Sequence, residues 1–147
     1  MTAKAILLVE DNPDDEAMTM RALSKMNLLN PIVVARDGAE ALDLLLGRGK
    51  HAGEPLNPQV VMLDLKLPKV DGLEVLQQVR ANPLTELLPV VILTSSNEQS
   101  DIVEGYSLGA NSYVRKPVES AAFREAVQRL GMYWVLLNEP PPAGGHP

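Results

Sequence analysis

The 147-residue sequence contains no cysteine, which excludes disulfide bonds, thiolate metal sites and cysteine nucleophiles. It has no apolar run approaching the roughly 20 residues that span a bilayer, and its first residues lack the pattern of a signal peptide. No cluster of Lys and Arg is visible, and the formal net charge is −6. We therefore expect a cytoplasmic protein whose direct partner is neither a membrane nor a nucleic acid.

Short apolar runs, rich in β-branched residues, recur along the chain. They are AILLV (5–9), IVVA (32–35), VVML (60–63) and VVIL (90–93), with a weaker candidate in SYVR (112–115). Continuous rather than alternating runs indicate parallel strands buried on both faces. Helical patterns separate or follow them, at residues 14–26, 38–46, 72–81, 98–108 and 120–137. This alternation predicts an α/β fold, a doubly wound five-stranded parallel sheet in the flavodoxin-like order 2-1-3-4-5, with helices on both faces.

The length of the chain argues for one domain, which we place at residues 1–137. Residues 47–59 contain several Gly and Pro and are expected to form a long loop before the third strand. Residues 138–147, NEPPPAGGHP, form a Pro/Gly-rich tail that we expect to be disordered.

Acidic residues crowd the end of the first predicted strand. Asp14, Asp15 and Glu16 are explained by the helix that follows, because acids in a first turn complement the helix dipole, and Asn12-Pro13 suits its start. Glu10 and Asp11 precede that helix and need another explanation. At the surface of a protein, two carboxylates about 4 Å apart repel by roughly 4 kcal/mol, so a cation is expected beside them.

Other polar residues also follow predicted strands. Asp64 ends the third strand, Thr94 the fourth and Lys116 the fifth. In a doubly wound sheet these ends line the crevice where ligands bind. Carboxylates that meet there favour Mg²⁺, and a hydroxyl and an ammonium beside them favour a phosphoryl group. Asp64 is the candidate nucleophile.

The same residues resemble the receiver domain of two-component response regulators. The resemblance covers residues 4 to about 130, and the matching elements are Glu10-Asp11, Asp64-x-x-x-Pro68-x-x-Asp71-Gly72, Thr94-Ser95 and Lys116-Pro117.

The resemblance implies specific roles for these residues. Asp64 would accept a phosphoryl group from a histidine kinase, while Glu10, Asp11 and the backbone carbonyl of Lys66 would help it to hold Mg²⁺. The same likeness assigns a switch role to Thr94 and Tyr113, a catalytic role to Thr94 and Lys116, and a cis peptide bond to Lys116-Pro117. It implies no enzymatic activity beyond the protein's own phosphorylation and dephosphorylation, with the signal passed on by protein contact.

Three further segments resemble a narrower group, the small single-domain regulators that partner bacterial phytochrome histidine kinases. The segments are EDNPDDEAMTMRAL, the loop 47–59 and GMYWVLLNEPPP. A phytochrome kinase is accordingly the expected partner.

Two other functions are compatible with the motifs. A small aspartyl-phosphate phosphatase of the haloacid-dehalogenase type needs a second Asp two residues after the nucleophile, whereas this chain has Lys66 there. A flavodoxin-like cofactor binder needs a phosphate loop after the first strand, where this chain has EDNPDD.

The last predicted helix is apolar on more than one side near its end. Its core-facing positions are predicted to be Phe123, Val127, Leu130, Trp134 and Leu137. Met132, Tyr133, Val135 and Leu136 then cover the other faces. A helix on the surface of a monomer should have a polar side. We therefore expect a homodimer through the fourth helix, the fifth strand and the last helix.

Overall fold

The computed structural model describes residues 3–117 and 119–142. Its parallel strands are β1 (Ile6–Val9), β2 (Ile32–Ala35), β3 (Val60–Leu63), β4 (Val90–Thr94) and β5 (Ser112–Arg115). The helices are α1 (Pro13–Ser24), α2 (Gly38–Leu46), α3 (Gly72–Ala81), α4 (Gln99–Ser107) and α5 (Ser120–Gly131). The strands form one sheet in the order β2-β1-β3-β4-β5, which confirms the predicted topology.

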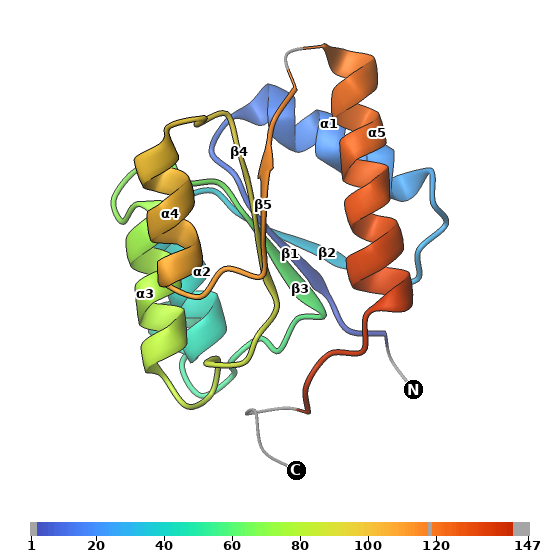
Figure 1. The fold of residues 1–147 in the computed structure, drawn as a ribbon. Coiled ribbons are helices and arrows are strands. Elements are labelled where there is room, and N and C mark those ends of the chain that lie inside the picture. Colours follow the sequence, from blue (N-terminus) through green and yellow to red (C-terminus); the bar gives the residue numbers. More distant parts are fainter. Residues whose placement is uncertain (1–2, 118, 143–147) are drawn as a thin grey trace.

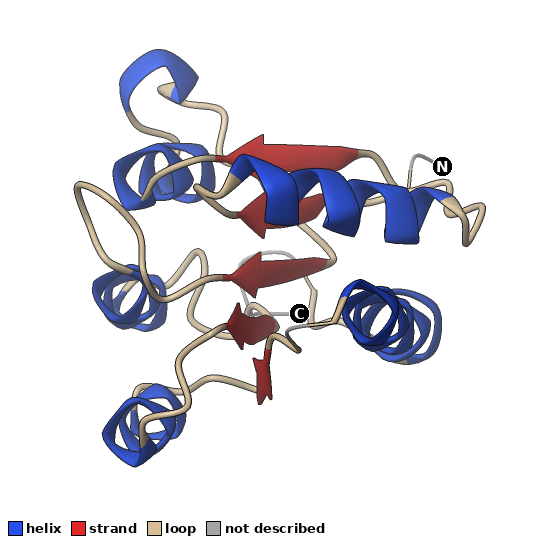
Figure 2. Cartoon of the chain, turned by 90° about the horizontal axis from the view of Figure 1, so that it is seen from above, coloured by secondary structure: helices blue, strands red, loops and turns tan. Residues whose placement is uncertain are grey.

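Helices cover both faces of the sheet (Figures 1 and 2). α1 and α5 pack on one face, over a core that includes Ile6, Leu8 and Met62. α2 and α3 pack on the other face, over a core that includes Leu7 and Leu63. Successive side chains of β1 and β3 point alternately into the two cores. Both sets must therefore be apolar, and the strands appear in the sequence as continuous apolar runs.

Side-chain caps fix where three helices begin. Asn12 accepts hydrogen bonds from the backbone N–H groups of Asp14 and Asp15, and Pro13 is the first residue of α1. Asp37 and Asp71 cap α2 and α3 in the same manner. These caps set each helix start directly after a strand end or loop, so the side chains around Glu10 and Asp64 stay at the edge of the sheet.

The end of the last helix differs from the prediction. α5 continues as a π-helix over Met132–Leu137, in which the Asn138 N–H bonds to the Tyr133 carbonyl five residues back. This wider turn changes which side chains face inward. Phe123, Val127 and Leu130 are buried as predicted, but Val135 is buried where Leu137, 68% exposed, was expected.

The predicted loop contains one short helical segment, and the disorder of the tail stays a prediction. Within residues 47–59, Gly49–His51 forms one turn of 3₁₀-helix. Residues 138–142 form neither helix nor strand, and residues 143–147 lie outside the described part of the chain. Among the described residues, every helix is too short or too polar to cross a membrane.

Arg80 ties α3 to two loops. Its Nε and Nη2 donate to the Gly109 carbonyl at 2.9 and 2.8 Å, and Nη2 also donates to Asn111 Oδ1 at 3.0 Å. Its Nη1 donates to the carbonyls of Leu88 and Glu86 at 2.8 and 3.0 Å. One guanidinium therefore satisfies backbone acceptors that no secondary structure pairs.

We expect Arg80→Met to lower the free energy of unfolding by about 3 kcal/mol, because these acceptors lose a charged donor and some remain buried. Urea denaturation measures the change. The control is Arg36→Met, which removes a 63% exposed arginine paired with Glu16 and should cost less than about 1 kcal/mol. Equal losses in the two variants would contradict this role for Arg80.

Candidate functional site

The register of β1 and β3 brings Glu10 and Asp64 together. Val9 lies beside Leu63 at the ends of these strands, and the Asp64 N–H donates to the Val9 carbonyl at 3.1 Å. Glu10 directly follows Val9, Asp64 directly follows Leu63, and both are buried. One carboxylate oxygen from each of Glu10, Asp11 and Asp64 lies within 4.8 Å of the others. This geometry suits a hard cation held by oxygen ligands.

Lys116 reaches the same point from the end of β5. Its Nζ donates to Glu10 Oε1 at 2.6 Å, to Asp15 Oδ2 at 2.9 Å and to Asp64 Oδ2 at 3.1 Å. Its side chain is only 6% exposed. A buried ammonium is expensive unless charged partners surround it, and here three carboxylates do so.

Thr94 connects Asp64 to the loop after β4. Its hydroxyl donates to Asp64 Oδ1 at 2.8 Å, and the Lys66 N–H donates to the same oxygen at 3.3 Å. Two residues further along the chain, the Ser96 carbonyl accepts a hydrogen bond from the Tyr113 hydroxyl at 3.0 Å. Thr94 and Tyr113 are thus joined through one short loop.

The two buried carboxylates differ in their electrostatics. Burial raises the pKa of Glu10 to about 7, and the nearby Lys116 ammonium offsets only part of that effect. Burial would also raise the pKa of Asp64, but Lys116 and the hydrogen bonds from Glu10 and Thr94 outweigh it, so the net pKa is lowered. Burial likewise opposes the charge of Lys116, yet its hydrogen bonds to Glu10 and Asp15 raise its pKa. Asp64 is therefore an ionised carboxylate near neutral pH, as a nucleophile must be.

The structure brings together most of the side chains predicted from the sequence. Glu10, Asp11, Asp64, Thr94 and Lys116 meet at one edge of the sheet. The Lys66 side chain is exposed, and the role of its carbonyl as a metal ligand stays a prediction.

One implied feature was wrong. The described residues contain no cis peptide bond, so Lys116-Pro117 is trans, the form that most X–Pro bonds adopt because it is lower in free energy.

Asp15 is the site residue that the sequence prediction missed, because its place in the first turn of α1 was explained by the helix dipole alone. Its spacing from Asp11 was no signal, because Asp11 precedes α1 and that spacing is not helical. The contact of Asp15 joins it to Lys116, 101 residues away in sequence.

The clustered carboxylates suit a divalent cation, and the hydroxyl and the buried ammonium beside them are donors for an anionic group. Comparison with known proteins agrees. The family model of the response regulator receiver domain matches residues 6–128, and the chain belongs to this family. Receivers work with histidine kinases and are generally not true enzymes. Because the chain belongs to this family, we no longer retain the phosphatase and the flavodoxin-like cofactor binder as alternatives.

The chain is also similar to three individual response regulators. It is 34% identical to response regulator Rcp1 of Synechocystis sp., over 90% of this chain and 89% of Rcp1. A crystal structure of the Mn²⁺-bound form of Rcp1 has a TM-score of 0.89 at 33% identity, covering 94% and 99% of the two chains.

The structure of the phosphorylated cyanobacterial phytochrome response regulator RcpA also has a TM-score of 0.89, at 34% identity over 95% and 99%. The bacteriophytochrome response regulator RtBRR has a TM-score of 0.74 at 55% identity over 95% and 85%.

Proposed function

We propose that this protein is a phosphorylation-controlled signalling regulator whose Asp64 accepts a phosphoryl group from a histidine kinase of the phytochrome type. The observation that carries the proposal is the contact of Lys116 Nζ with Asp64 Oδ2, beside carboxylates that suit a divalent cation. Its similarity to RcpA and RtBRR supports the phytochrome partner. The signal is passed on by contact between proteins.

The transfer forms one bond and breaks one. A carboxylate oxygen of Asp64 bonds to phosphorus as the P–N bond of the kinase phosphohistidine breaks, and the imidazole leaves with the electron pair. Lys116 and Thr94 donate hydrogen bonds to the phosphoryl oxygens as negative charge accumulates there. Glu10, Asp11, Asp64 and the Lys66 carbonyl would hold Mg²⁺, which supplies further positive charge to these oxygens.

Thr94 and Tyr113 can transmit a conformational change from the phosphorylated site to the surface of the protein. Thr94 now donates to Asp64, and a phosphoryl oxygen on that residue would become its new acceptor. Any movement of Thr94 pulls on the loop that carries Ser96, whose carbonyl holds the Tyr113 hydroxyl. Phosphorylation would thereby bias the loop, β5 and α4 between two arrangements.

Phosphotransfer from purified kinases tests the partner. With Mg²⁺, we expect an autophosphorylated phytochrome kinase to label this protein at least about tenfold faster than an unrelated histidine kinase, since selective partners differ in binding free energy. Label from acetyl phosphate provides the kinase-independent reference. Equal rates from both kinases would contradict the phytochrome assignment while leaving the receiver chemistry intact.

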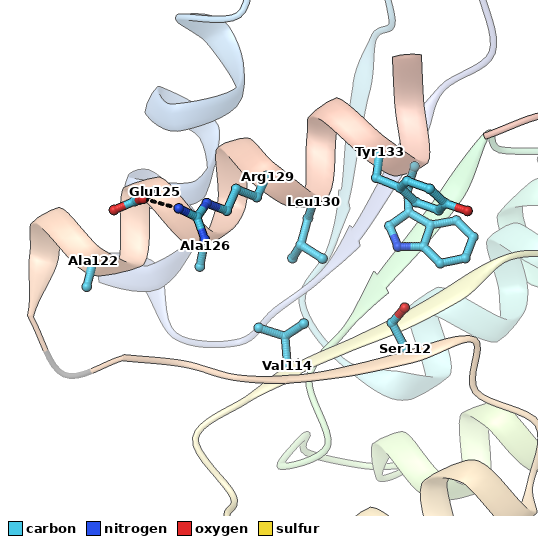
Figure 3. A pocket seen from close by; sticks show the side chains of 9 residues that line it. Ser112, Val114, Ala122, Glu125, Ala126, Arg129, Leu130 and Tyr133 are labelled. Carbon is cyan, nitrogen blue, oxygen red and sulfur yellow. Dashed lines mark hydrogen bonds and ion pairs between the residues drawn. The ribbon is translucent and has the colours of Figure 1, made fainter. Parts of the chain in front are cut away.

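We further propose that two copies of the chain associate through α4, β5 and the last helix. Between β5 and α5 lies an apolar groove of about 550 Å³ (Figure 3). Its lining residues are Ser112, Val114, Ala122, Glu125, Ala126, Arg129, Leu130, Tyr133 and Trp134.

Charges and exposed apolar side chains favour a second copy as the occupant. Glu125 and Arg129 form an exposed ion pair one turn apart. If a two-fold axis relates two copies at this place, Glu125 of each copy can pair with Arg129 of the other. Met132 and Leu136, next to the groove in sequence, are 51% and 56% exposed.

We expect the double variant Met132→Gln, Leu136→Gln to be monomeric by light scattering at concentrations where the unaltered protein is dimeric, because its interface loses apolar area. Leu29→Gln is the control, since Leu29 is 90% exposed on the loop after α1, and it should stay dimeric. Dimers that persist in the double variant would refute this interface.

A further inference from the structure

Asp15 contacts the ammonium group of Lys116 from another part of the fold. Lys116 lies just after β5, whereas Asp15 lies in the first turn of α1, and Asp15 Oδ2 accepts from Lys116 Nζ at 2.9 Å. The Asp15 side chain is 28% exposed, so it forms the outer wall of the site. Its neighbour Asp14 is exposed, and the hydrogen bonds of Lys116 Nζ go to Glu10, Asp15 and Asp64 instead.

The three carboxylates together fix the position of the ammonium. An ammonium has three N–H donors, and Glu10, Asp15 and Asp64 provide one acceptor for each. Glu10 and Asp64 also belong to the group that can hold a metal ion, while Asp15 does not. Asp15 is thus the one acceptor of the three that stays available to Lys116 when the other two carboxylates are engaged by a cation or a phosphoryl group.

We propose that Asp15 is a positioning residue for phosphoryl transfer, which holds the Lys116 ammonium beside Asp64 so that two of its N–H groups point at the incoming phosphoryl oxygens. The inference rests on the proposed phosphorylation of Asp64. A donor fixed before the reaction does not have to be reorganised as charge develops, which is the source of its catalytic effect. Without Asp15, the long lysine side chain would sample other rotamers.

Asp14 provides a matched control. Asp14 and Asp15 are adjacent acids in the first turn of α1, so either change to Ala removes one negative charge near the helix start. Only Asp15→Ala also removes an acceptor from Lys116. A difference between the two variants therefore reports the contact rather than the net charge or the helix dipole.

The kinetic test uses acetyl phosphate and Mg²⁺ with the full chain. We expect Asp15→Ala to lower the maximal rate of Asp64 labelling about fivefold, the effect of losing one ordinary hydrogen bond. Its KM for acetyl phosphate should not rise, because the substitution removes a negative charge near the place where the negatively charged acetyl phosphate binds. Asp14→Ala should keep the maximal rate, and Asp15→Asn, which retains an acceptor oxygen, should recover part of it.

A second readout needs neither metal nor phosphoryl donor. In the metal-free protein, the Lys116 ammonium protons should exchange slowly enough to be seen by nitrogen-edited NMR. We expect this signal in the unaltered protein and in Asp14→Ala, and its loss in Asp15→Ala.

The outcomes separate this inference from the proposed function. If Asp15→Ala matches Asp14→Ala in maximal rate and in the ammonium signal, the positioning role is refuted, while labelled Asp64 still supports the receiver function. A rise in KM at an unchanged maximal rate would also refute it. If the unaltered protein is not labelled at all, both proposals fail.

Discussion

Asp64→Asn is expected to abolish covalent labelling of the protein by acetyl phosphate or by a phosphorylated kinase. Asp64 is the nucleophile candidate because it is the buried carboxylate whose pKa is lowered, with Thr94 and Lys116 donating to its two oxygens. The amide of Asn has nearly the same shape, but its oxygen is a poor nucleophile because it carries no full negative charge. Mass spectrometry of the intact protein, with and without Mg²⁺, measures the label.

Asp71→Asn is the control for that experiment. It makes the same chemical change at an exposed acid, and the amide oxygen can still accept the Glu74 N–H that Asp71 accepts as the cap of α3. This variant should label like the unaltered protein. Undiminished labelling of Asp64→Asn would mean that another residue carries the phosphoryl group, and the proposed function would have to be abandoned.

Lys116→Met should slow labelling by roughly 100-fold or more, the usual effect of removing one donor that stabilises charge in a transition state. Methionine fills similar space in this buried position but cannot donate to a phosphoryl oxygen. The expected loss is in the maximal rate rather than in KM, because the ammonium is most important when charge has developed on the transferring group.

Lys25→Met is the matched control, since Lys25 is an exposed lysine at the end of α1 and has no contact with Asp64. It should label at close to the normal rate. A loss of less than about threefold in Lys116→Met would contradict the role of the ammonium, because the transition-state argument requires a much larger effect. Thermal unfolding of the same samples checks that both variants are folded.

Much of this site follows from the pattern of strands alone. The apolar runs predicted the strands to within one residue, and Glu10, Asp64, Thr94 and Lys116 stand at or next to their carboxyl ends. In a parallel sheet these ends share one edge, so the order of the strands was enough to bring the side chains together. Asn12 was also predicted at the start of a helix, because capping depends on residues only two or three positions apart.

Other features depend on contacts that no local pattern encodes. The backbone carbonyls that Arg80 binds lie in loops up to 29 residues away from it in sequence. The burial of Val135 in place of Leu137 depends on a π-helical turn, and the helical period used for the prediction assumes regular α-helix throughout.

The sequence by itself determined which segments form strands and that Glu10, Asp64 and Lys116 follow strand ends, because apolar runs and their neighbours are properties of short segments. Only the tertiary structure decided that Asp15 is the third partner of Lys116 and which side of the last helix is buried. These depend on how α1 and α5 are rotated and packed against the sheet, and that rotation is fixed by many distant contacts acting together.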